Sequence, residues 1–528
     1  IEKVAHNAKF DLLVLHTAGF EVTPLTFDTM VAEWLINPTS RNLGLKAQAS
    51  ERLGVQMTEI DELIGKGKNQ ISMAEVPVER AAPYAAADAV MTLRLVEPMR
   101  KDLEAHAAQK LYHDVENPLI PILAEMEETG ILIDLAFFTE FAKELQTEIN
   151  RLTEEAYHLA GDQFNLNSTQ QLSDTLFQKL GLEPPDRTKK TSSGKFSTSA
   201  EVLESMKGMH PLVDTILDYR ELSKLQSTYV EALPVQINPN DGRIHTTFNQ
   251  TGTVTGRIAS QNPNLQNIPI RTEQGRRVRQ GFIAAEGHKL LAVDYSQIEL
   301  RIVAHLAQDE AMMKAFHEGQ DIHVTTAAAI ANIPLNEVSK QERRHAKAIN
   351  FGLIYGMSPF GLTRTTDLTL AEAENFVREY FRQFPGVKKW LDNTRLEATR
   401  QGYVETLLGR RRYFPALAAG TNYTIRQREE REAINAPVQG TAADIIKLAM
   451  LKLPDALKEV GLKTKMILQV HDELIFEVPL EEIDQATRLV KSLMESAFPL
   501  SVPLVTEAKI GNNWGELSVI DPDVLVME

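Results

Sequence analysis

A chain of 528 residues is too long for one hydrophobic core, so we expect three or four domains. Its 43% hydrophobic and 24% charged residues are ordinary for a soluble globular protein, and no apolar run approaches the ~20 residues of a membrane span. The absence of cysteine excludes disulfides and thiolate metal sites and favours an intracellular setting, while a net charge of −16 argues mildly against a nucleic-acid partner. Local basic clusters, such as residues 409–412, still offer surface for phosphates.

Residues 1–105 alternate short apolar runs with amphipathic stretches, which predicts part of an α/β domain. Two carboxylate motifs stand out there. NAKFD ends on Asp11 and opens a helical run, and YAAAD places Tyr84 and Asp88 on one face of an alanine-rich helix. Taken alone, each acid is better explained as a helix cap or a solvated side chain than as a metal ligand.

Residues 106–240 are strongly helical. An apolar stripe from Phe138 to Leu159 predicts a long helix with Gly161 as its C-cap, and Ser168 is expected to begin a shorter helix. Residues 183–199 have no periodicity and predict a loop whose cations could bind a phosphate backbone or simply face solvent. A further helix is expected near 211–233, followed by turns and short strands over 240–290.

The stretch HKLLAVDYSQIELRIVAHL, residues 288–306, predicts a buried strand that ends on Asp294 and passes directly into a helix. An aspartate in this place can be a turn former or a helix cap. It can also be a functional carboxylate at the end of a rigid element, and the segments that follow favour this interpretation.

A helix beginning near Gln341 places Arg343, Lys347, Phe351 and Tyr355 at successive i+4 positions, so one face changes gradually from cationic to aromatic. A nucleoside triphosphate has the same polarity. The alternative, an amphipathic helix with buried aromatic residues and solvated cations, fits less well because the two kinds of residue lie in line.

The rest of 305–435 is expected to be mostly helical, and a helix is expected over 440–453. Residues 465–478 predict a hairpin with Asp472 at its tip. Asp294 and Asp472 could together hold two divalent ions ~3.5–4 Å apart, the arrangement that assists in-line phosphoryl transfer. Mg²⁺ suits such a site because it needs few carboxylates.

Six motifs together resemble the A-family DNA polymerases, most closely the large fragment of the bacterial members, nearly end to end. They are TGRIAS (255–260), NPNLQNIPIR (262–271), DYSQIELR (294–301), RRHAKAINFGLIYG (343–356), INAPVQGTAADIIK (434–447) and HDE (471–473). The resemblance implies a multidomain α/β protein with a right-hand polymerase fold: an antiparallel-sheet palm, helical fingers and thumb, and a partial RNase H-like 3′–5′ exonuclease domain. The implied boundaries are 1–105 for the exonuclease-like domain, 106–240 for the thumb, 241–300 and 440–528 for the palm, and 301–439 for the fingers.

The same resemblance implies template-directed addition of dNTPs to a primer 3′-hydroxyl in replication and repair, with two Mg²⁺ ions that Mn²⁺ can replace. The implied partners are primer–template DNA and dNTPs, and no membrane is involved. The resemblance also implies a monomer that lies in the bacterial cytoplasm and associates with the nucleoid. The implied catalytic residues are Asp294, Asp472, Glu473 and Lys347, and the implied metal ligands are Asp294, Asp472 and the carbonyl of Tyr295. Implied nucleotide contacts are Arg343, Lys347, Phe351, Tyr355, His323, Glu299 as steric gate, and Gln297. Implied DNA contacts are Arg257, Arg271, Asn435, Gln439, Arg431, His471 and Lys224.

Asp11, Tyr84 and Asp88 match the second and third exonuclease motifs of the family. The first motif, Asp-x-Glu, would lie upstream of Ile1, so we expect these 528 residues not to proofread. A 5′-nuclease domain is also not among them. Two other functions stay open at this point: a single-subunit RNA polymerase, against which Glu299 argues, and a catalytically silent DNA-binding protein of the same fold.

Overall fold

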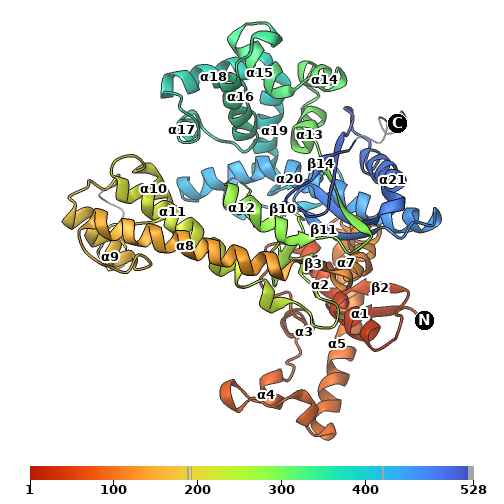
Figure 1. Ribbon diagram of the computed structural model, residues 1–528. Helices are drawn as coiled ribbons and strands as arrows, with labels where there is room; N and C mark the ends of the chain where they lie inside the picture. Colours follow the sequence, from red (N-terminus) through yellow and green to blue (C-terminus); the bar gives the residue numbers. More distant parts are fainter. Residues whose placement is uncertain (187–189, 192, 271, 419–420, 521–528) are drawn as a thin grey trace.

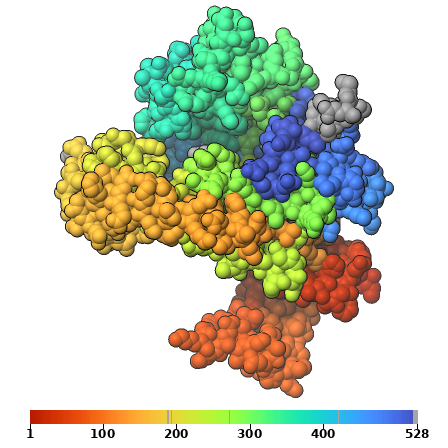
Figure 2. All heavy atoms as spheres, in the orientation of Figure 1, coloured from red at the N-terminus to blue at the C-terminus, as the bar shows by residue number. Residues whose placement is uncertain are grey.

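The computed structural model describes residues 1–186, 190–191, 193–270, 272–418 and 421–520. Figure 1 shows helices α14 to α18 clustered above a central sheet, an arm of α8 to α11 projecting to the left, and the N-terminal segments below. Figure 2 shows the same three masses in space-filling form, teal, yellow and red to orange. Within the described ranges, no helix combines the length and the hydropathy that a membrane span requires.

The central sheet has five strands in the order β11-β12-β8-β13-β14, and all of its pairs are antiparallel. It confirms both the predicted buried strand and the predicted hairpin. Leu290 to Val293 are at most 1% exposed, because α21 (Ile483–Glu495) packs against β8, β12 and β13 and every side chain of this run lies in the core. The strands are β8 (His288–Tyr295), β11 (Lys465–Val470), β12 (Glu473–Pro479), β13 (Thr506–Gly511) and β14 (Ser518–Val519).

Two helices that the sequence predicts near the functional motifs are present. The α13 helix (Ile298–Ala307) begins three residues after β8 ends. The α16 helix (Lys340–Ile354) is capped at its N-terminus by Ser339. The capping box of Ser339 with Glu342 satisfies N–H groups of the first turn. The remaining upper helices are α14 (Glu310–His317), α15 (Ile322–Ala331), α17 (Pro359–Thr363), α18 (Leu370–Gln383) and α19 (Pro385–Gln401).

The helix expected over 440–453 is much longer. The α20 helix (Tyr423–Glu459) runs straight through Pro437, Gly440 and Pro454, which break the sequence pattern. Gly440 is there for packing, because a Cβ at this position would lie 2.5 Å from Cγ2 of Thr406 and 3.2 Å from the carbonyl oxygen of Thr255. Tertiary burial therefore outweighs the local preference of these residues.

The arm confirms the predicted apolar stripe. The α8 helix (Leu135–Ala160) buries its stripe residues from Phe138 to Ala156 and half-buries Leu159, and Gly161 adopts the left-handed conformation of a C-cap. Ser168 caps α9 (Thr169–Ser173), as expected. The arm also contains α10 (Ala200–Ser205) and α11 (Pro211–Leu225), which packs along α8. Part of the predicted loop at 183–199 lies outside the described residues. A three-residue strand, β3 (Ile131–Ile133), and α7 (Asn117–Thr129) lead into the arm.

The N-terminal segments form a separate hydrophobic core around Phe27 and Trp34. A parallel strand pair and the helices beside it confirm the mixed α/β pattern. The α7 helix packs against both α1 and α20, which ties this core to the centre of the molecule. The elements are β1 (Lys3–Ala5), α1 (Ala8–Thr17), β2 (Leu25–Asp28), α2 (Thr29–Ile36) and α5 (Val78–Ala105).

Candidate functional site

The two predicted acids meet at one end of the central sheet. In the register of β12 and β8, Glu473 lies opposite Asp294, and Asp472 directly precedes it in the hairpin turn. The backbone N–H of Tyr295 donates to the carbonyl of Asp472 over 3.1 Å. Asp294 is exposed at the strand end while the residues before it are buried, so its carboxylate is available to a ligand.

The acids act on one another electrostatically. Although Asp294 is accessible at the strand end, the protein packed around it removes part of its hydration. This desolvation, and then the charges of Glu473 and Asp472, raise the pKa of Asp294 to about 7. Burial also raises the pKa of Asp472, against the opposing charge of Arg257. The site thus carries negative charge that the protein itself only partly compensates, a state that favours binding of a cation.

Sequence reasoning missed several neighbours of these acids. Glu507 pairs with Asp294 across β13 and β8, so the acid lies between two other carboxylates in adjacent strands. Lys509 forms a 2.5 Å ion pair with Glu507 and lowers the pKa of Asp294 in opposition to the acids. The Arg279 guanidinium stacks over Trp514 at 4.0 Å and lowers the pKa of Glu473 against the effect of burial. The spacing of Glu507 and Lys509 could have indicated a strand with both side chains on one face, but not that this strand lies beside Asp294.

Glu299 interacts electrostatically with Asp472 and is hydrogen-bonded to Tyr355 at the end of the α16 helix. It is 5% exposed, accepts a 2.7 Å hydrogen bond from Arg257, and accepts a second from the hydroxyl of Tyr355. Burial raises the pKa of Glu299, and among the charges Asp472 acts in the same direction. Burial and Glu299 raise the pKa of Tyr355, so the phenol keeps its proton and serves as the donor. The predicted gate is therefore held from two sides.

The α16 face has the predicted gradient. Arg343 and Lys347 are exposed, whereas Phe351 and Tyr355 are half-buried with ring centroids 6.5 Å apart. Arg343 is occupied by a 2.7 Å ion pair with Asp321. Within the described ranges, no ion pair is formed by Lys347, which leaves its ammonium group free for a ligand.

His323 lies deeper than its predicted role suggests. It is 2% exposed, packs on Phe351 with ring centroids 5.7 Å apart, and pairs through Nδ1 with the amide of Asn350 at 3.0 Å. Burial lowers its pKa to about 4, so the imidazole is neutral. Its contact with phosphate stays a prediction.

The predicted DNA contacts are spread more widely. Gln439 and Asn435 are half-buried on α20. Gln439 lies near Tyr355. The Oδ1 atom of Asn435 is buried and has no hydrogen-bond partner in the described part of the chain. Arg431 packs against Gly356 and is exposed, as is His471 in the hairpin turn. Gln297 is the left-handed N-cap of α13. Lys224 is exposed on α11, in the arm of Figure 1, and Arg271 lies outside the described residues.

The donor set for a metal is small. Across the described ranges, no group of three or more His, Cys, Asp or Glu side chains is arranged to hold an ion. The predicted ligands are two carboxylates, Asp294 and Asp472, and the main-chain carbonyl of Tyr295. This oxygen set fits Mg²⁺, which binds through one or two carboxylates and completes its shell with water and phosphate oxygens.

The three residues that match exonuclease motifs also converge. Asp11, Tyr84 and Asp88 line one cavity of about 780 Å³ beneath α1 and α5. Lys46 lies over the ring of Tyr84 at 4.9 Å and forms a 3.2 Å ion pair with Glu59. Burial raises the pKa of both aspartates, as expected of acids that face one cavity.

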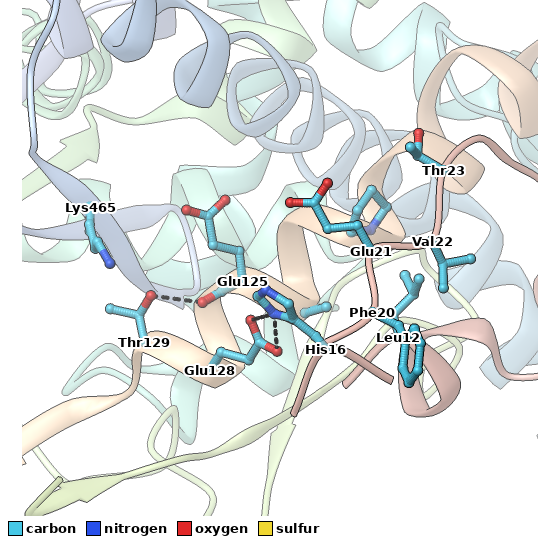
Figure 3. Close-up of a pocket in the computed structure, with 12 residues that line it drawn as sticks. Leu12, His16, Phe20, Glu21, Val22, Thr23, Glu125, Glu128, Thr129 and Lys465 are labelled. Atoms are coloured by element: carbon cyan, nitrogen blue, oxygen red, sulfur yellow. Dashed lines mark hydrogen bonds and ion pairs between the residues drawn. The ribbon is translucent and has the colours of Figure 1, made fainter. Parts of the chain in front are cut away.

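A further cavity of about 470 Å³ lies between α1 and α7 (Figure 3). His16 faces Glu128 there at 2.7 Å. None of the residues predicted to act in catalysis or binding lines this cavity, so it is separate from the acids of the sheet.

Comparisons with known proteins agree with this geometry. A family model described as DNA polymerase family A matches residues 136–516, and one described as 3′-5′ exonuclease matches residues 1–104. The chain is 49% identical to DNA polymerase I of Chloroflexus aurantiacus over 523 residues, which cover 98% of this chain and 55% of the relative. It is 51% identical to the thermostable DNA polymerase I of Thermus aquaticus over 404 residues, 76% of this chain and 48% of the relative.

The fold has a counterpart among solved structures. The POL domain of Pol1 from M. smegmatis, in complex with DNA primer-template and dNTP, superposes with a TM-score of 0.88 at 38% sequence identity. The match covers 97% of this chain and 86% of that one. The chain spans about half the length of the curated relatives it matches.

Proposed function

The chain belongs to DNA polymerase family A, and from this membership and the site geometry we propose that it is a DNA-directed DNA polymerase, a nucleotidyltransferase of replication and repair. In the proposed reaction the primer 3′-hydroxyl attacks the α-phosphate of a dNTP, and pyrophosphate leaves. One observation carries the proposal: Asp294 and Asp472 meet at the end of the sheet, and Glu299, which interacts electrostatically with Asp472, is hydrogen-bonded to Tyr355 at the end of the cationic-to-aromatic face of α16.

Asp294, Asp472 and the Tyr295 carbonyl would hold two Mg²⁺ ions, with Mn²⁺ as a substitute and Glu473 in support. Bound there, such ions neutralise charge on the attacking and leaving oxygens. The raised pKa of Asp294 supports this assignment, because the crowded carboxylates lack a sufficient counter-charge of their own. Positioning and charge neutralisation would provide most of the catalysis.

The α16 face would bind the incoming nucleotide. Lys347 and Arg343 contact the triphosphate, with His323 beneath them and Lys347 as the proton donor to pyrophosphate. Phe351 packs on the sugar and Tyr355 stacks at the insertion site. Glu299, held by Tyr355 and Arg257, leaves no space for a 2′-hydroxyl, and Gln297 lies beside it at the start of α13.

Residues around the acids would hold the primer–template. Arg257, Asn435 and Gln439 are proposed to read minor-groove acceptors, which are similar for every correct pair and therefore report pair shape. His471, Arg431, Arg271 and Lys224 would contact the primer and template backbone. In this scheme the central sheet is the palm, the helices above it the fingers, the α8–α11 arm the thumb, and the protein acts as a monomer.

The 1–104 segment would not proofread on its own. Its cavity offers Asp11 and Asp88, while the nearby Glu59 is paired with Lys46. Two-metal hydrolysis needs further carboxylate ligands. A labelled mismatched primer incubated with Mg²⁺ and no dNTP should therefore stay intact, and steady shortening from the 3′ end would contradict this proposal.

Primer extension tests the main proposal. The 528-residue chain should extend a labelled primer with dNTPs and Mg²⁺, and chelation should stop it. Extension with rNTPs at a similar rate would favour an RNA polymerase instead. Binding of primer–template without extension would favour a catalytically silent DNA-binding protein.

A further inference from the structure

Trp34 joins the exonuclease-like segment to the loop that carries Arg257. It lies on α2, is 1% exposed, and donates its indole N–H to the carbonyl of Thr253 over 2.9 Å. Thr253 in turn donates its hydroxyl to the carbonyl of Arg257 over 2.8 Å. The Arg257 guanidinium then reaches Glu299 over 2.7 Å. A short chain of hydrogen bonds therefore runs from the exonuclease-like segment through Arg257 to Glu299, whose pKa is in turn affected by the charge of Asp472.

The indole is itself held by buried charges. Arg410 and Lys447 lie over the ring of Trp34 at 5.0 and 5.2 Å. Arg410 forms ion pairs with Glu116 and with Asp444, and Lys447 forms a 2.7 Å ion pair with Glu116. Cation–π contacts strengthen when water is excluded, as it is here. Trp34 consequently has little freedom to move relative to the centre of the molecule.

Arg410, one of these buried charges, also contacts the loop formed by residues 253–257. Gly256 has φ +87°, and a Cβ at this position would lie 2.5 Å from Nε of Arg410. The α20 helix lies close to Thr255, as shown by Gly440: a Cβ at this position would lie 3.2 Å from the carbonyl oxygen of Thr255. Trp34, Arg410 and α20 thus surround residues 253–257, and among the three only Trp34 comes from the exonuclease-like segment.

We propose that Trp34 is a positioning residue for Arg257, so that the exonuclease-like segment sets the geometry of the polymerase site without any nuclease chemistry. The proposal rests on the proposed polymerase function for its catalytic consequence. A purely structural role would instead make Trp34 a domain contact, whose loss changes stability but not the behaviour of Arg257. The two roles differ in measurable ways.

The first test is a double-mutant cycle in single-turnover extension of a matched primer. Trp34→Phe keeps an aromatic ring but removes the donor, and should lower extension efficiency about fivefold, the effect of one lost hydrogen bond. In an Arg257→Ala background the same change should have no further effect, because the residue it positions is gone. Trp390→Phe, an equivalent change on α19, should stay within about twofold of the parent.

Thr253→Val provides a second variant, since it removes the next bond of the chain from a half-buried site. It should reproduce the loss and the non-additivity with Arg257→Ala. Parent-like extension by both variants, or a loss that persists in full without Arg257, would overturn the proposal.

Hydrogen exchange tests the link without chemistry, so its outcome is separate from that of the polymerase proposal. Trp34→Phe and Thr253→Val should raise amide exchange selectively in peptides covering residues 253–258, while Trp390→Phe should not. Unchanged exchange in these peptides, or an increase spread evenly over the chain, would refute the positioning role even if the parent failed to extend DNA.

Discussion

Glu473 lies directly opposite Asp294 in the antiparallel register of β12 and β8, with Asp472 at the preceding position. This pairing brings two distant sequence motifs to one place, and it makes both aspartates indispensable if they share divalent ions. We expect Asp294→Asn and Asp472→Asn each to lower primer extension by about a thousandfold or more. Binding of primer–template, measured by fluorescence anisotropy, should stay within a few-fold of the parent.

Glu507→Gln is the matched control. Glu507 also faces Asp294 across the sheet, but it is exposed and already paired with Lys509. We expect its loss to change extension by less than about tenfold. Extension by either Asp→Asn variant at a rate near that of this control would contradict the assignment of the acids.

Asp294 should also affect stability in a pH-dependent way. Burial and its acidic neighbours raise its pKa from 3.8 to about 7. The folded protein therefore binds this proton more tightly than the unfolded chain, and the free energy of unfolding falls as pH rises between those two values. Without divalent ions, Asp294→Asn should raise Tm at about pH 8 by roughly 1–3 °C, a value discounted for the exposure of the group.

The difference should shrink at about pH 5, where Asp294 is mostly protonated in the folded protein. Differential scanning calorimetry at both pH values provides the measurement. Equal Tm differences at the two pH values, or a less stable variant at the higher one, would be inconsistent with a raised pKa.

Local patterns of the sequence predicted much of this site. The apolar run before Asp294 and the two runs around Asp472 indicated strand ends, and the i+4 series from Arg343 to Tyr355 indicated a graded helix face. These features depend on short-range periodicity, which a sequence displays directly. The pairing of the two acids was inferred from two strand ends that each carry an aspartate, and the family motifs taken together supported it.

Long-range relationships were not predictable in this way. No pattern around Glu507 indicates that β13 lies beside β8, and nothing near Trp34 indicates a bond to Thr253. The α20 helix was underestimated because Pro437 and Gly440 interrupt its pattern, although the buried surroundings stabilise it. Such contacts depend on tertiary packing, which local propensity does not encode.

Glu299 provides a test of substrate selection. Its carboxylate is held by Tyr355 and Arg257, and we propose that it blocks the space that a 2′-hydroxyl would need. Glu299→Ala should open this space and raise rNTP incorporation relative to dNTP by about 10- to 100-fold, the usual scale for relief of a steric clash. Steady-state incorporation of single nucleotides gives the ratio.

Glu299→Gln keeps the volume and removes the charge, so it separates the two contributions of this side chain. Discrimination against rNTPs should persist in this variant, with some loss of overall efficiency as the bond from Arg257 weakens. If Glu299→Ala selected sugars as the parent does, the gate would have to be another residue.

The buried charges beside Trp34, formed by Arg410, Lys447 and their acidic partners, should strongly affect stability where the N-terminal segments meet the centre of the molecule. Burial alone would raise the pKa of Glu116, but Lys447 and Arg410 outweigh it and lower the pKa to about 2. Lys447→Met would leave Arg410 to balance both Glu116 and Asp444, and a buried charge without its partner costs about 3–5 kcal/mol. We expect thermal unfolding to begin at a clearly lower temperature in this variant.

Lys452→Met is a control on the same helix, where the exposed ammonium group donates to the carbonyls of Ser496 and Ala497 over 3.4 and 3.2 Å. Its effect should stay below about 1 kcal/mol. Adding Glu116→Gln to Lys447→Met should restore part of the lost stability, because the positive charge of Arg410 is then matched by the negative charge of Asp444 alone. Equal stability of the two Lys→Met variants, or no recovery in the double variant, would show that the network is not electrostatically coupled.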